Sequence, residues 1–99
     1  MKINQYIQQY RSVASRQTPH VRCRDGFTMS VQAGGDGIYS IPRGMAGHYE
    51  SVEVGRVDAH VPEFKEYEDG SVFPFVPCSV VDKVIENHGG IVLSRRLYS

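Results

Sequence analysis

The sequence predicts a single α+β domain in which an N-terminal and a C-terminal amphipathic helix pack on an antiparallel sheet of four or five strands. Three observations lead to this fold class. Apolar residues recur at spacings of three and four near both ends, apolar and polar residues alternate between them, and 99 residues of ordinary composition suit one small core. We expect one domain over residues 1–99, with 94–99 as a frayed tail.

The first predicted element is a helix over residues 3–16. Its apolar residues fall on one face of a helix with 3.6 residues per turn, as in a helix that covers a sheet. Pro19 limits the helix, because the residue before a proline is pushed out of the α region. The apolar face consists of Ile3, Tyr6, Ile7, Tyr10, Val13 and Ala14.

A β-hairpin follows this helix. We expect strands over residues 21–24 and 27–33, joined by Asp25 and Gly26, because Asp-Gly readily adopts the positive φ angles of a two-residue turn. Every other residue of the second strand is apolar, which predicts one buried face and one solvated face.

Three further strands are predicted in the middle of the chain. Residues 38–41 form a short strand that Pro42 ends, and residues 49–55 alternate in the manner of a half-buried strand. Residues 72–76 are expected at an edge of the sheet, because Pro74 has no N–H to donate to a neighbouring strand.

The last predicted helix covers residues 79–88. Ser79 and Asp82 have the spacing of a capping box, with Asp in place of the usual Glu or Gln. Gly89 stands where a left-handed helix end favours glycine. Residues 91–93 would add a final short strand.

Charge is distributed unevenly along the chain. Residues 1–47 contain six basic and two acidic side chains, whereas residues 48–88 contain three basic and nine acidic ones. If the fold leaves the acidic segment on one side, the resulting negative patch would attract and orient a basic partner. The alternative is that opposite charges interleave in space and the aromatic residues point inward.

The acidic segment is therefore the predicted partner-binding site. Aromatic residues lie among its acids, and aromatic anchors inside a polar rim are typical of binding hot spots. The predicted site consists of Tyr49, Glu50, Glu53, Asp58, Glu63, Glu66, Tyr67, Glu68 and Asp69.

The sequence gives little support for metal or phosphate binding. The GGDG run at 34–37 lacks the lysine and hydroxyl residue of a phosphate-binding loop and leads into a strand pattern. His20 and Cys23 are the one closely spaced pair of candidate zinc ligands, and zinc usually takes four. We therefore predict no metal and no cofactor.

Nucleophilic catalysis is also disfavoured. No serine lies in a Gly-x-Ser-x-Gly elbow, and Cys23 and Cys78 are best explained as buried thiols in a reducing compartment. Cys78 lies just ahead of a predicted helix, and a helix N-terminus can lower the pKa of a nearby thiol. We predict that the protein is not an enzyme; a small metal- or thiol-dependent enzyme stays as an alternative.

Several motifs together resemble a family of small proteins encoded by tailed phages and prophages of Gram-negative bacteria. They are GFTMSVQAG, YSIPR, SVEVG, VPEFKEYED and FVPCSVVDKVIENHGGI, and they cover residues 26–91. The resemblance implies a context in which small phage proteins bind host machinery. By analogy, some anti-CRISPR proteins use acidic surfaces to occupy nucleic-acid-binding grooves.

We therefore expect a non-enzymatic phage accessory protein that binds and inhibits a host defence complex through its acidic surface. The expected partner is a host protein or ribonucleoprotein with a basic surface. Residues 1–13 contain neither the apolar run of a signal peptide nor a membrane span, so we expect no membrane contact and a location in the cytoplasm of the bacterial host.

Two other modes of action stay open. Charge disfavours direct nucleic-acid binding, because the arginines at 16, 22, 24 and 43 form no concentrated basic stripe. A homo-oligomeric structural or regulatory phage protein, such as a homodimer joined by strand edges or tyrosine faces, stays as an alternative.

Overall fold

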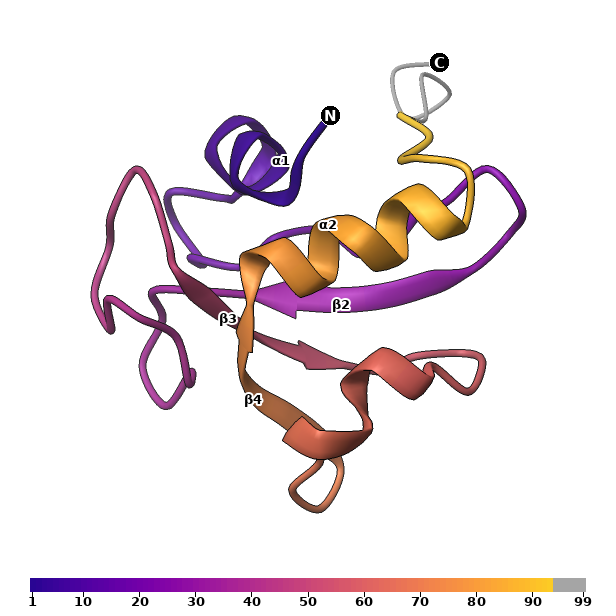
Figure 1. The fold of residues 1–99 in the computed structure, drawn as a ribbon. Helices are drawn as coiled ribbons and strands as arrows, with labels where there is room; N and C mark the ends of the chain where they lie inside the picture. The colour runs from indigo at the N-terminus through magenta and orange to yellow at the C-terminus, as the bar shows by residue number, and fades with distance from the viewer. Residues whose placement is uncertain (94–99) are drawn as a thin grey trace.

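In a computed structural model that describes residues 1–93, the chain forms a four-stranded antiparallel sheet in the order β1-β2-β3-β4, with helices α1 and α2 on one face (Figure 1). The α+β class is confirmed. The expected tail at 94–99 lies outside the described residues. The elements are α1 (Ile3–Tyr10), β1 (Val21–Arg22), β2 (Thr28–Gln32), β3 (Ser51–Gly55), the 3₁₀-helix η1 (Pro62–Tyr67), β4 (Val72–Pro77) and α2 (Cys78–Asn87).

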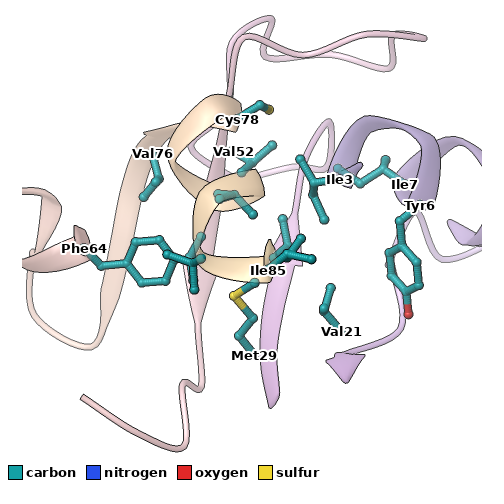
Figure 2. Packing of buried hydrophobic residues seen from close by; sticks show 14 of the residues in the cluster. Ile3, Tyr6, Ile7, Val21, Met29, Val52, Phe64, Val76, Cys78 and Ile85 are labelled. Carbon is teal, nitrogen blue, oxygen red and sulfur yellow. The ribbon is translucent and has the colours of Figure 1, made fainter. Parts of the chain in front are cut away.

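The core lies between the sheet and the two helices. Val31 pairs with Val54 across β2 and β3, and Val52 pairs with Val76 across β3 and β4, so valines line the face under the helices. Figure 2 shows Ile3 and Ile85, from α1 and α2, among these buried side chains. The alternation predicted from the sequence therefore places this face correctly.

Helix α1 ends at Tyr10, six residues earlier than predicted. Arg11 adopts an extended backbone, and its guanidinium donates to the carbonyls of Ala33 and Ala46 in the body of the domain. The next apolar residue of the predicted stripe, Val13, is 87% exposed. The periodic pattern thus continues beyond the point where a tertiary contact ends the helix.

Helix α2 spans Cys78–Asn87, close to its predicted range, but its predicted capping box is wrong. Ser79 makes no side-chain cap, and the Asp82 carboxylate instead accepts the N–H of Ile3 at 2.8 Å. Asp82 therefore satisfies one of the free N–H groups at the start of α1 and ties the two helices together. The helix ends, as expected, with Gly89 at a positive φ of 94°.

Two short strands predicted from sequence are reduced to single bridges. Residue Ile41 bridges Ser51, and Ile91 bridges Cys23, so neither 38–41 nor 91–93 forms a strand. The hairpin turn also differs from the prediction, because Cys23 N–H donates to the carbonyl of Phe27 and leaves three residues in the turn. Strand β4 does lie at an edge, as Pro74 predicted.

The acidic segment contains a 3₁₀-helix that the sequence patterns did not indicate. Helix η1 begins with Pro62, whose fixed φ suits a first helical position. Phe64 is completely buried, and its ring centroid lies 5.5 Å from that of Phe73 on β4. None of the helices in residues 1–93 is long and apolar enough to cross a bilayer.

Candidate protein-binding surface

The predicted site residues do not share one surface. Glu50, Glu53 and Asp58 lie at or beside β3, whereas the remaining acids lie on η1 or directly after it. We call the η1 group the acidic ridge. It consists of Glu63, Glu66, Tyr67, Glu68 and Asp69.

Tyr49 is not part of any surface, and the prediction that it anchors a partner is wrong. It is 1% exposed, because its hydroxyl is held inside the loop that precedes β3. The hydroxyl donates to the carbonyl of Gly44 at 2.9 Å and accepts from the N–H of Ala46 at 2.9 Å and from Arg11 Nη1 at 2.7 Å. Tyr49 therefore fixes the loop.

Two of the scattered acids are also engaged inside the molecule. The Glu53 carboxylate accepts the N–H of Tyr39 at 3.0 Å. The Asp58 carboxylate accepts both the N–H and the hydroxyl of Thr28, each at 3.1 Å. These two residues hold loops against the sheet, whereas Glu50 is exposed on the surface.

The acidic ridge is built on an apolar anchor. Phe64 enters the core from the centre of η1, which leaves Glu63 and Glu66 exposed. Glu63 Oε2 accepts from Asn87 Nδ2 on α2 at 3.1 Å, so this carboxylate is positioned by a second element. Glu68 is 3.6 Å from Lys65, but both are exposed, and such a pair contributes little to stability.

A shallow groove runs between the ridge and α2. It has a volume of about 300 Å³ and combines half-buried apolar surface from Tyr67 and Val80 with charged groups at its sides. The charged lining is Glu63, Glu66 and, across the groove, Lys83. An apolar strip beside carboxylates suits a partner residue with an aliphatic stem and a cationic end, such as arginine.

Neither cysteine has the environment of a nucleophile. Burial, with Asp25 and Asp58 nearby, raises the pKa of Cys23 to about 11, and burial together with Asp82 raises the pKa of Cys78 to about 11. Both therefore stay thiols at neutral pH. At Cys78, burial outweighs any lowering of the pKa by the start of α2.

The described part of the chain contains no assembled set of metal ligands. Within residues 1–93, no three His, Cys, Asp or Glu side chains gather in a geometry that could hold an ion. His20 is exposed and Cys23 is buried, so the closely spaced pair does not converge.

A second surface was missed from the sequence. Tyr39 and Phe75 are both exposed, and their ring centroids are 5.6 Å apart. With Ile41 and Arg43, whose guanidinium lies 5.8 Å from the Tyr39 ring centroid, they form what we call the aromatic patch. The motif FPFVP carried a signal, because Phe73 and Phe75 would share one face of a regular strand, whereas Phe75 turns outward at a φ of 55°.

Comparisons with protein-family models, curated proteins and solved structures found no match for the chain.

Proposed function

We propose that the protein is a non-enzymatic binding protein whose acidic ridge docks on a basic surface of another macromolecule. The observation that supports this most directly is the anchoring of η1. Phe64 is buried at its centre while Glu63, Glu66 and Glu68 stay in solvent, so the carboxylates stand on a fixed support. Charge held in place in this way speeds encounter with an opposite charge and orients the complex.

The groove beside the ridge supplies the contacts that charge alone does not. Tyr67 lies between exposed acids and packs partly against the core, which limits the entropy that it loses on binding. An arginine of the partner could lay its stem on Tyr67 and Val80 and form paired hydrogen bonds with Glu63 or Glu66.

We propose further that the partner is a host defence complex, either a protein or a ribonucleoprotein, and that the protein acts in the cytoplasm of a bacterial host. This step rests on the resemblance of residues 26–91 to small phage and prophage proteins. Carboxylates on the ridge would take the place of phosphates in a basic nucleic-acid-binding groove and so block the complex, as an anti-CRISPR protein would.

Charge reversal on the ridge tests the proposal. A triple variant, Glu63→Lys, Glu66→Lys and Glu68→Lys, should lose capture of the partner from host lysate, while the matched control Asp36→Lys, Glu50→Lys and Glu86→Lys should keep it. Wild-type capture should also weaken as salt rises. Far-UV circular dichroism melts establish that both variants fold.

A functional assay separates inhibition from mere binding. Expressed in a host with an active CRISPR system, the wild-type chain should raise the plating efficiency of a targeted phage, and the ridge variant should not. Equal capture by the ridge variant and the wild type would refute the acidic-ridge proposal, whatever the plating result.

A further inference from the structure

The loop at 34–48 has almost no regular secondary structure, yet buried polar side chains fix it. Ser40 is completely buried; its hydroxyl donates to the carbonyl of Pro42 at 2.8 Å and accepts the N–H of Gly34 at 3.1 Å. Tyr49 and Arg11 hold the other end of the loop. The residues that this loop turns outward are therefore presented in one geometry, which lowers the entropy lost on binding.

The aromatic patch is what the loop presents. Tyr39, Ile41 and Phe75 are 43%, 45% and 37% exposed. The N–H of Phe75 donates to the carbonyl of Tyr39 at 3.2 Å, so strand β4 and the loop are joined directly beneath the two rings. Exposed apolar residues gathered in this way are typical of a contact surface.

Phe75 is held there against its own backbone preference. Its φ of 55° is unusual for a bulky residue and costs free energy. On a regular strand it would share a face with Phe73, which packs against the core. The strained conformation instead places an aromatic ring on the surface beside Tyr39.

Charges of both signs flank the rings. The Arg43 guanidinium lies 5.8 Å from the Tyr39 ring centroid, and the Glu53 carboxylate accepts the N–H of the same tyrosine. We propose that the aromatic patch joins two copies of this chain about a two-fold axis. In a two-fold interface, every contact from one copy to the other is repeated in the reverse direction. Arg43 of each copy can therefore meet Glu53 of the other. A partner surface that carried charge of only one sign would repel either Arg43 or Glu53.

The edges of the sheet favour a contact between faces over an extended sheet. Strand β4 contains Pro74 and Pro77, which have no N–H, and the N–H of Val72 is already bonded to Asp69. At the other edge, the carbonyl of Arg22 accepts from Val92. Pairing of strand edges, the alternative raised from the sequence, would therefore find few free backbone N–H and C=O groups.

The dimer should be weak. At exposures of 37–45%, Tyr39, Ile41 and Phe75 offer roughly 250 Å² of surface per copy. A stable interface buries about 800 Å² per partner, so the contact must include neighbouring polar surface and depend on concentration.

Sedimentation equilibrium or light scattering of the full chain, from about 10 μM to about 1 mM, tests this directly. The mass should rise from 11.1 kDa towards twice that value. Phe75→Asn should stay monomeric with an equal or higher melting temperature, because asparagine tolerates a positive φ. Val13→Asn removes a more exposed apolar residue outside the patch and should leave dimerisation unchanged.

Charge variants test the proposed pairing. Arg43→Glu should weaken dimerisation about tenfold, while Arg16→Glu, on an exposed turn elsewhere, should not. A wild-type chain that stays at one copy throughout the concentration range, or a Phe75→Asn chain that dimerises like the wild type, would overturn the proposal. The ridge triple variant should dimerise normally, so failure here is distinct from failure of the acidic-ridge proposal.

Discussion

The acidic ridge and the loop at 34–48 are both fixed in place, but by opposite means. Helix η1 is held by an apolar side chain, Phe64, that packs against Phe73. The loop is held by hydrogen bonds from Arg11, Ser40 and Tyr49 to its backbone. Apolar anchoring tolerates small shifts, whereas buried hydrogen bonds fix particular atoms and leave costly unpaired groups when one is removed.

The largest expected effect comes from removing the apolar anchor. Phe64→Ala should lower the free energy of unfolding by about 3–5 kcal/mol, because it leaves a cavity between η1, β4 and α2. Urea denaturation followed by circular dichroism measures this loss. Tyr67→Ala removes a half-buried neighbour on the same helix and should cost clearly less. Equal losses would mean that η1 is not held by Phe64.

Removing one hydroxyl should loosen the other region selectively. Tyr49→Phe keeps the ring but leaves Arg11, Gly44 and Ala46 without their shared partner, at a cost of about 1–3 kcal/mol. Hydrogen exchange should accelerate in residues 42–48 while η1 is unaffected. Tyr10→Phe, at a half-buried tyrosine on α1, is the control. Uniform acceleration across the domain would contradict a local role.

A smaller effect is expected where one polar group joins the two helices. Asp82→Ala removes the acceptor of the Ile3 N–H and should cost about 1 kcal/mol, with faster exchange in the first turn of α1. Ser79→Ala should change stability little, because Ser79 caps nothing. If Ser79→Ala were instead the costlier change, the capping box suggested by the sequence would be the better account.

These contacts also explain which features the sequence could predict. Alternation in β2 and β3 and the apolar stripe of α2 are local patterns, and they located the sheet face and the second helix. The end of α1 depends on Arg11 reaching Ala33 and Ala46, and the burial of Tyr49 depends on the same arginine. Such partners are 22 to 38 residues apart, so no local periodicity reports them.

The same reasoning applies to the candidate surfaces. The excess of acids after residue 48 could be counted from the sequence, and η1 gathers part of it. The engagement of Glu53 and Asp58 inside the molecule could not be predicted, because their hydrogen-bond partners lie 14 and 30 residues away in the chain. The exposure of Phe75 was missed because its positive φ turns the side chain away from the face that it would have on a regular strand.

The smallest expected effect is a pH dependence at the far end of α2, where a polar contact again fixes a turn. The Phe27 N–H, followed by His88, holds the pKa of Asp25 below its ordinary value of 3.8, and His88 Nδ1 lies 2.7 Å from Asp25 Oδ2. Because the folded-state pKa is depressed, the stabilisation is present above the unfolded-state pKa. It is lost as pH falls from that value through the folded-state pKa.

Asp25→Asn should therefore reduce stability above about pH 5, and its difference from the wild type should shrink as the pH falls below 3.8. The measurement is the difference in urea midpoint between the two chains across this range. The difference should be modest, because Asp25 is exposed and solvent screens its interaction with His88. Asp36→Asn, at an exposed acid outside this contact, should follow the wild-type profile throughout. A difference in urea midpoint that stayed constant at every pH would mean that Asp25 acts through the geometry of the turn. The charge of its carboxylate would then have no role in stability.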